Sequence, residues 1–332
     1  MNPASISEFK NYSLGISYQF NSSIDEALIA YIGFDRIHDF YPQSFGGLVK
    51  WNEFSFGLGF GQKYNESLDV GEIQIKTVQD PDGTGEYITP VIEKLIHSYS
   101  FSAAYSFREL MNTSNEFSLG FRYSLNRFNE YDQIGELVGE AEDYFHSFNI
   151  GLFSSFKLDE TRNISLGLSY ETKSEFKAQF EINSGIILDP GPINPPAYTQ
   201  VESYLIGSTP SELRIDCGVD ATSSLKFLLN LTTIFWKTET NSLKDQIEFS
   251  ASAVYNINEM FTPSIGFYFT DYKYEETYFS QLNSELNAFF VTAGLKFNYN
   301  IFSADLAIAD SHLFSGDFRK QTIGKLSIGI IL

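Results

Sequence analysis

The stretch that decides the fold is LRIDCGVDATSSLKFLLNLTTIFW, which runs from Leu213 to Trp236. Apolar and polar side chains alternate along 213–221, and the alternation resumes at Leu225 after the polar sequence 222–224. Because successive side chains of a strand point to opposite faces, this pattern predicts two antiparallel strands joined by a tight turn. Each strand has one apolar face, and the fold depends on whether that face meets a protein core or lipid.

The same alternation recurs along the chain in about fourteen runs, and the connections between the runs alternate in length. The short connections are 52–53, 109–114, 158–161, 222–223, 257–259 and 300–301. The others include 21–42, 62–93, 129–143, 181–211, 275–286 and 311–320, with only 239–244 brief. Tight periplasmic turns and long outer loops are typical of an up-and-down membrane barrel. A Greek-key sandwich predicts no such asymmetry.

The composition agrees with a membrane barrel. Of the 332 residues, 43% are hydrophobic, yet no run approaches the roughly 20 consecutive apolar residues of a membrane helix. Barrel strands need no such run, because lipid-facing and lumen-facing residues alternate. The second face of the runs is rich in Ser, Gly and charged residues, which suits a polar lumen. We therefore predict an all-β, up-and-down antiparallel transmembrane barrel of about 14 strands, with the apolar faces toward lipid.

Two segments need a separate assignment. Residues 27–36 also alternate, but a fifteenth strand would break both the loop pattern and the even strand number, so we place them in the first outer loop. The run that ends at Leu168 and Tyr170 keeps its alternation through Phe176, Ala178 and Phe180, which predicts that all of these share the lipid-facing side. Residues 10–332 are then a single barrel domain, preceded by the short segment 1–9.

The chain shows no pattern typical of catalysis. A net charge of −20 argues against nucleic acid as a partner, since phosphates need a basic surface. The single cysteine, Cys217, excludes an intramolecular disulfide and a cysteine metal cluster. The four histidines have no metal-like spacing, and no G-x-S-x-G sequence occurs. We therefore expect no enzymatic activity, no metal centre and no cofactor.

One acidic segment weakly resembles a calcium-binding loop. Asp80, Asp82 and Glu86 place carboxylates close together around flexible glycines. The segment lacks the third acidic position and the bidentate glutamate of an EF-hand. A plain acidic turn is the alternative that these residues leave open.

Several apolar side chains fall on the predicted lumen face, where a water-filled pore would not need them. They are Phe153, Leu228, Trp236, Tyr268 and Phe290, together with Leu48, Ile96, Phe145 and Ile234. We expect the first five to contact a hydrophobic solute. The alternative is that some of them pack against a plug or an inward loop.

Three glycines, Gly57, Gly59 and Gly61, follow one another on a single face of the third strand. Glycines inside a strand mark bulges or the close approach of another group. A bulge here would kink the strand and open the barrel wall sideways. Alternatively, these small residues simply leave space in the lumen.

The sequence also resembles a known family. Asn2-Pro3-Ala4 is similar to the NPA of the NPAG element that follows the N-terminal plug in the FadL/TodX long-chain fatty-acid outer-membrane transporters. The hairpin led by Pro210 and ending at Trp236 is similar to the proline-led hairpin of that family. The segment 289–310, FFVTAGLKFNYNIFSADLAIAD, is similar to the last strands of the family.

This resemblance implies a fourteen-stranded barrel that takes up long-chain fatty acids or other hydrophobic molecules passively. Substrate would bind inside the barrel and leave through a lateral opening beside a kinked early strand, which corresponds to 57–61. The family carries a signal peptide and a plug before the NPA element, and neither precedes Asn2 here, so we expect residues 1–9 to be a plug remnant. Two further departures are Ser5 where the family has Gly, and Leu332 where such barrels usually end in an aromatic residue.

The expected location is the outer membrane of a Gram-negative bacterium, where a monomer would contact the lipid bilayer and lipopolysaccharide and bind a hydrophobic ligand. Two alternatives remain open. One is a barrel that transports nothing and serves as a structural or secretion-associated scaffold. The other is a general porin for polar solutes.

Overall fold

The computed structural model describes most of the chain. The described residues are 2–9, 12–23, 37–69, 73–74, 85, 87–88, 90–107, 115–134, 137–159, 161–184, 203–238, 243–271, 287–315 and 320–331. Two predictions from the sequence concern residues outside these ranges. These are the possible extra strand at 27–36 and the calcium candidates Asp80, Asp82 and Glu86.

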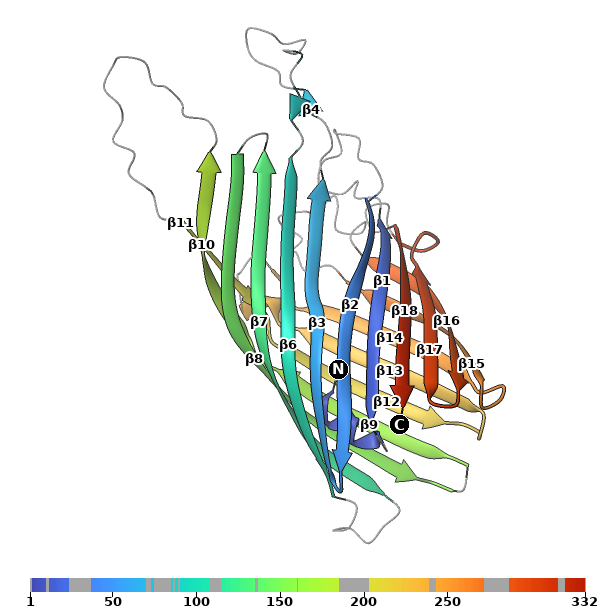
Figure 1. Cartoon of the computed structure of the whole chain (residues 1–332). Coiled ribbons are helices and arrows are strands. Elements are labelled where there is room, and N and C mark those ends of the chain that lie inside the picture. Colours follow the sequence, from blue (N-terminus) through green and yellow to red (C-terminus); the bar gives the residue numbers. More distant parts are fainter. Residues whose placement is uncertain are drawn as a thin grey trace, which may run out of the picture.

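The chain forms one antiparallel sheet that closes on itself (Figure 1). Its segments are β1 Ser13–Ser23, β2 Ile37–Trp51, β3 Phe54–Asp69, β6 Val91–Ser106, β7 Glu116–Ile134, β8 Leu137–Lys157, β9 Asn163–Glu171, β10 Ser174–Ser184, β11 Ser203–Thr209, β12 Glu212–Asp220, β13 Leu225–Ile234, β14 Gln246–Tyr255, β15 Phe261–Thr270, β16 Ala288–Tyr299, β17 Phe302–Asp310 and β18 Gln321–Ile331. The remaining elements are the hairpin of β4 Ile73–Gln74 and β5 Tyr87–Ile88, and two 3-10 helices, η1 Pro3–Glu8 and η2 Trp236–Thr238.

The sixteen segments of the sheet make a closed barrel of fourteen strands, because four of them are halves of two strands. Glu171 of β9 pairs with Glu212 of β12, and Ser174 of β10 pairs with Thr209 of β11 in the same register. Each pair of segments therefore continues one strand. The barrel closes where β1 pairs with β18 from Ser13 to Ser23, and the two lie side by side in Figure 1. The predicted fold class and strand number are confirmed.

Within the described residues, the predicted short connections 52–53, 222–223, 257–259 and 300–301 join neighbouring strands at one end of the barrel, called here the short-turn end (Figure 1). Asn52 and Asn300 begin two of these turns with positive φ values of 54° and 52°. Asparagine tolerates this left-handed conformation better than most residues. The opposite end is called the long-loop end. No helix within the described residues is long and apolar enough to cross a membrane.

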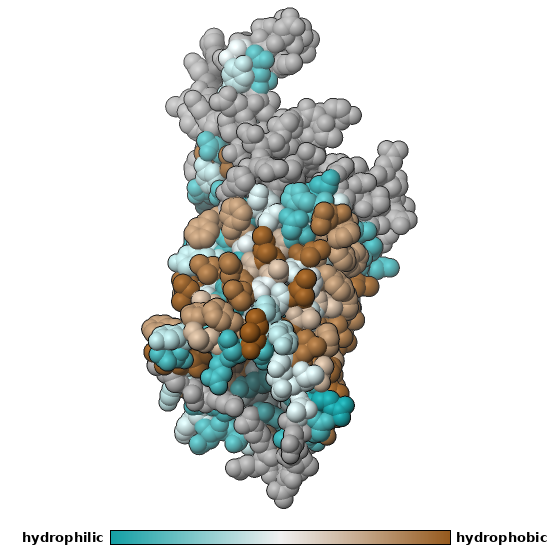
Figure 2. All heavy atoms as spheres, turned by 90° about the vertical axis from the view of Figure 1, so that its right-hand side faces the viewer, coloured by the Kyte–Doolittle hydropathy of each residue, from teal (hydrophilic) through white to brown (hydrophobic). Residues whose placement is uncertain are grey.

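The outer face of the barrel is apolar, as predicted. Large hydrophobic side chains project outward from almost every strand, and Leu58 and Leu306 are 70% and 60% exposed. In Figure 2 such side chains form a brown belt across the middle of the face over β15–β18. The exposed tyrosines include Tyr12, Tyr99, Tyr144, Tyr170, Tyr255 and Tyr299. An apolar belt with accompanying aromatic residues is the outer surface that a bilayer requires.

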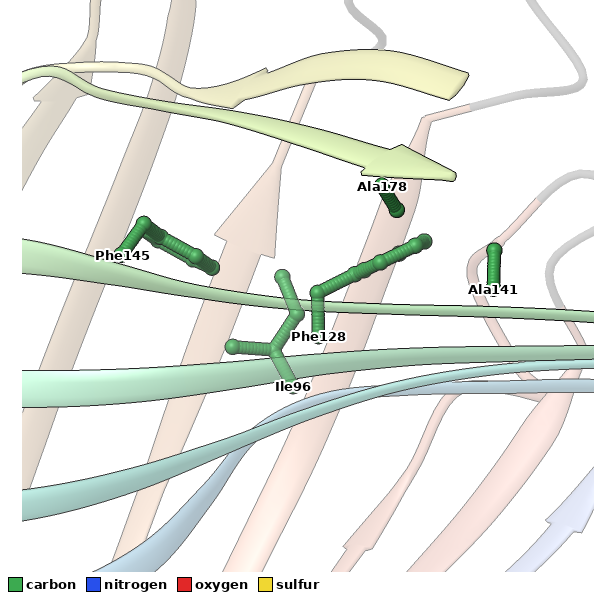
Figure 3. Packing of buried hydrophobic residues seen from close by; sticks show 5 residues of the cluster. All are labelled: Ile96, Phe128, Ala141, Phe145 and Ala178. Atoms are coloured by element: carbon green, nitrogen blue, oxygen red, sulfur yellow. The ribbon is translucent and has the colours of Figure 1, made fainter. Parts of the chain in front are cut away.

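Toward the long-loop end, the polarity of the two faces inverts on β6, β7, β8 and β10. On β8 the outward residues change from Phe148 and Ile150 to Tyr144 and Glu142, which are exposed. The inward side here holds a buried cluster of Ile96, Phe128, Ala141, Phe145 and Ala178 (Figure 3). Phe176 and Leu205 are partly buried and pack against it. We call these seven residues the apolar lumen cluster. Polar outside and apolar inside is the arrangement of a protein in water, so the wall extends beyond the belt.

This extension corrects four loop predictions, since β2 begins at Ile37 inside 21–42 and β11 Ser203–Thr209 lies inside 181–211. The segments 62–93 and 129–143 were expected to be loops because they are acidic and polar. Instead β3 continues to Asp69 and β6 begins at Val91, while β7 ends at Ile134 and β8 begins at Leu137. Beyond the bilayer, a strand carries polar residues on its outer face, so acidic composition does not end it.

The predicted orientation of Phe176 and Ala178 is also wrong. Tyr170 is exposed on the outer face, whereas Ala178 is fully buried and Phe176 packs inside the barrel. Between Glu171 and Gln179 the chain has one residue more than the facing segment of β8. Because side chains alternate with a period of two, one extra residue moves all that follow to the opposite face.

Candidate functional site

The N-terminal segment lies inside the barrel, against the inner face of β6, β7 and β8 (Figure 1). Asn2 caps η1 by accepting a hydrogen bond from the backbone nitrogen of Ala4 at 2.9 Å. The amide nitrogen of Asn2 donates to the carbonyl oxygen of Leu152 at 2.8 Å and to that of Leu168 at 3.3 Å. Pro3 is suited to the first turn of η1, where a backbone donor is not needed.

The segment lies close to the wall because the wall positions that face it are glycines. Three wall glycines face it, and a Cβ on Gly120 would overlap the backbone of Ala4, while one on Gly151 would overlap the side chain of Asn2. From β2, Lys50 Nζ donates a hydrogen bond to the carbonyl oxygen of Ser7 at 2.8 Å. Buried hydrogen bonds therefore fix the Asn2-Pro3-Ala4 segment in the lumen.

A cluster of charged side chains crosses the lumen next to η1. Glu171 of β9 forms ion pairs with Lys63 of β3 and with Arg122 of β7, the second at 2.8 Å. Asn149 donates to the same carboxylate at 3.2 Å. The register of β3 against β6 shifts between Gln62 and Tyr64, so Lys63 is the extra residue of a bulge. Bulges redirect side chains, and this one brings Lys63 to Glu171.

These charges line a polar cavity of about 300 Å³, called here the lumen pocket. Its lining consists of Gly59, Phe60, Gly61, Gln62, Lys63, Ser98, Ser100, Arg122, Ser124, Glu171 and Glu212. On the other side of the same wall lies an apolar groove of about 960 Å³, called here the outer groove. Its lining includes the outward side chains of Leu14, Phe45, Val49, Leu58 and Phe101, with Gly46, Gly47, Gly57 and Gly59.

The lumen pocket and the outer groove share Gly59, Phe60 and Ser100 in their linings. The wall between them is thin, because Gly57, Gly59 and Gly61 bring no side chains to its inner face. A Cβ on Gly59 would lie 3.1 Å from Ser100 Oγ, which itself donates to the carbonyl oxygen of Gly59. Of the three glycines predicted to mark a lateral opening, Gly57 lines the outer groove, Gly61 lines the lumen pocket and Gly59 lines both. The bulge expected among them is wrong, because 57–61 pair in unbroken register with β2 and β6, and the bulge lies just beyond, at Lys63.

The five predicted substrate-contacting residues lie in three separate places. Phe153 and Leu228 line one further lumen cavity of about 310 Å³ toward the short-turn end. Tyr268 and Phe290 are neighbours on β15 and β16, with ring centroids 5.8 Å apart. Trp236 lies past the end of β13 in η2, where its indole nitrogen donates to Gln246 Oε1 at 2.9 Å. The five do not form a single site.

Sequence patterns missed several residues of this site. The glycines 120, 151 and 167 that face the Asn2 segment look like ordinary lumen positions until η1 is placed beside them. Lys63 lay inside a presumed loop, and only the bulge directs it to Glu171. Among the described residues, no group of three His, Cys, Asp or Glu side chains is arranged to hold a metal ion.

The fold matches solved structures of bacterial channels. The toluene transporter TbuX of Ralstonia pickettii superposes with a TM-score of 0.63 at 12% identity, over 100% of this chain and 92% of that chain. A FadL homologue from Pseudomonas aeruginosa gives 0.61 at 12% identity, over 99% and 92%. The toluene transporter TodX of Pseudomonas putida gives 0.60 at 12% identity, over 100% and 92%.

These matches show that the chain has the FadL-like fold suggested by its sequence. No protein-family model matches the sequence. No curated protein matches it either.

Proposed function

We propose that this chain is a passive transporter for hydrophobic molecules in the outer membrane of a Gram-negative bacterium. The observation that carries the proposal is the thin wall at Gly59, with the lumen pocket on one side and the outer groove on the other. The free energy of a hydrophobic molecule falls when it moves from a polar lumen to an apolar surface. The decrease is about 25 cal/mol per Å² of apolar area removed from water. No energy source is needed for that step.

The path begins at the long-loop end. There the apolar lumen cluster offers aromatic rings, and Phe128 stacks on Phe176 with centroids 4.2 Å apart. A solute that enters beside these rings moves inward to the lumen pocket. Below it, η1 occupies part of the lumen, hydrogen-bonded to β8 and β9 through Asn2. The exit favoured by this arrangement is sideways, past Gly59 into the outer groove and the bilayer.

Two substrate classes agree with this path. The sequence resemblance suggests long-chain fatty acids, whereas TbuX and TodX are described as toluene transporters. Both classes have an apolar body, and they differ in whether a carboxylate must also cross the lumen. The chain is proposed to act as a monomer in contact with the bilayer and lipopolysaccharide.

Uptake by living cells tests the proposal. A Gram-negative host without its own hydrophobic transporters is supplied with labelled toluene or dodecanol, because its lipopolysaccharide leaflet slows spontaneous crossing. Cells that produce this chain are expected to take up the label faster than cells with an empty vector. Sucrose permeation serves as the control, and it should stay at the empty-vector rate because η1 occupies part of the lumen.

The outcomes separate the alternatives. Rapid sucrose entry would identify a general porin. Uptake of neither class, from a barrel that migrates as folded in unheated gel samples, would favour a scaffold.

A further inference from the structure

The lumen pocket contains two cations and two carboxylates. Lys63 and Arg122 reach it from β3 and β7, and Glu171 and Glu212 from the paired strands β9 and β12. Glu171 and Glu212 are direct cross-strand partners. Like charges in such a position repel, and the ion pairs of Glu171 with Lys63 and Arg122 offset this repulsion.

Glu171 is the centre of this arrangement. Its side chain is 10% exposed, and its two oxygens accept hydrogen bonds from three donors on three strands, Lys63, Arg122 and Asn149. Bonds between a charged donor and a carboxylate are about twice as strong as neutral ones. The carboxylate of Glu171 therefore occupies the position where the cations of the pocket would otherwise receive an anionic group from a ligand.

We propose that Glu171 is a specificity-determining residue that restricts the transport path to neutral hydrophobic molecules. The inference rests on the proposed function and narrows its substrate class. A passenger that carries a carboxylate brings a third negative charge into a pocket whose charges already balance. It must leave its carboxylate poorly solvated beside Glu171 and Glu212 or compete with Glu171 for the cations. An alcohol or an aromatic hydrocarbon meets neither penalty.

A matched pair of probes tests the inference. Dodecanol and dodecanoate have the same alkyl chain, and at neutral pH only the second carries a charge. The wild-type chain in the host described above is expected to take up dodecanol faster than dodecanoate. Glu171→Gln removes one negative charge beside Lys63 and Arg122 at nearly constant volume. It should raise dodecanoate uptake by roughly tenfold, the scale of one charge-assisted hydrogen bond, while dodecanol uptake stays at the wild-type rate.

Two further variants keep the test decisive. Asp216→Asn is the control, because Asp216 is a lumen carboxylate outside this pocket that accepts a hydrogen bond from Asn230 at 2.7 Å. It changes the net charge of the lumen equally and should leave dodecanoate uptake unchanged. Glu212→Gln removes a charge from the pocket itself and should raise dodecanoate uptake even if Glu171→Gln fails to fold.

Three results would overturn the inference. One is equal wild-type uptake of the two probes. The second is the same response from Glu171→Gln and Asp216→Asn, and the third is unchanged dodecanoate uptake in both folded glutamine variants. If the wild-type chain takes up neither probe above the empty vector, the proposed function itself fails.

Discussion

The side-chain amide of Asn2 donates to the carbonyl oxygen of Leu152, 2.8 Å away on β8. This bond joins the start of the chain to the inner wall of a barrel whose outer face is apolar. It depends on Gly151 and Gly167, since a side chain at Gly151 would occupy the place of the Asn2 amide. The Asn2-Pro3-Ala4 segment and the glycines of the wall therefore act as one unit that narrows the lumen.

Substitution of Gly151 by Ala should displace this unit and open the lumen to water. The new methyl group overlaps the Asn2 side chain, so Asn2 loses its bonds to β8 and β9, worth about 1 kcal/mol each. We expect a several-fold rise in single-channel conductance in planar bilayers. Gly324→Ala is the control, because a Cβ there meets only Phe20 side-chain atoms at 3.7 Å or more. Equal conductance in the two variants would show that η1 does not restrict the pore.

The double variant Trp236→Ala/Phe290→Ala should lower uptake of hydrophobic solutes while the barrel still folds. Phe290 pairs with Tyr268 across β15 and β16, and Trp236 lies in η2 beyond the end of β13. The backbone pairing of the strands does not need either side chain, so the barrel is expected to fold. Labelled dodecanol uptake measures the effect, and retained heat-modifiable migration in gels reports the fold. Wild-type uptake in this variant would remove both residues from the proposed path.

Substitution of Phe176 by Ala should weaken the wall beyond the bilayer. Phe176 stacks on Phe128 and lies 5.4 Å from the Phe145 ring, so its removal leaves a cavity in the apolar lumen cluster. Phe176 is only partly buried, so the cost should be below the value of about 3–5 kcal/mol that is typical of a fully buried phenylalanine. Hydrogen exchange should rise in β10 and β11 and stay unchanged in β15 and β16. A uniform response across the barrel would contradict a local role for the cluster.

The turn between β8 and β9 should make stability depend on pH. Hydrogen bonds from the backbone of Thr161, the Arg162 side chain and the Arg162 backbone hold the pKa of Asp159 well below its usual range. A folded-state pKa below the unfolded value means that the contribution is present above about pH 3.9, the unfolded pKa of Asp. It is lost as the pH falls through the lowered folded-state value.

Asp159→Asn should therefore lower the urea midpoint at neutral pH and have little effect in strong acid. Unfolding curves at the two pH values measure this difference. The same loss at both would assign the effect to turn geometry rather than to charge.

Strand number and the lipid-facing side followed from the alternation of residues such as those in 213–234, because a bilayer imposes that pattern on every strand that crosses it. Beyond the bilayer the constraint ends, and there the predictions failed. The acidic composition of 129–143 predicts a loop, but β7 and β8 pass through most of it. Phe176 was assigned to the wrong face, because one extra residue after Glu171 reverses the alternation.

The candidate site was predictable only where it follows the alternation. Gly57, Gly59 and Gly61 and the inward position of Arg122 can be counted from the pattern. The ion pair of Lys63 with Glu171 joins strands far apart in the sequence and depends on a bulge, so no local pattern contains it. The contact of Asn2 with β8 and β9 is equally long-range, and the family resemblance pointed to the motif without its partners.

Hydrophobic molecules are proposed to leave the barrel through the wall at Gly59. Gly59→Val thickens that wall by placing a branched side chain against Ser100, whose hydroxyl can shift. Gly324→Val is the control, a glycine that faces outward beside Phe20 and lies outside both the lumen pocket and the outer groove. The measurement is the initial rate of dodecanol uptake at equal levels of folded barrel. A large loss in Gly59→Val with the wild-type rate in Gly324→Val is predicted, and equal rates in the two variants would contradict lateral exit at this wall.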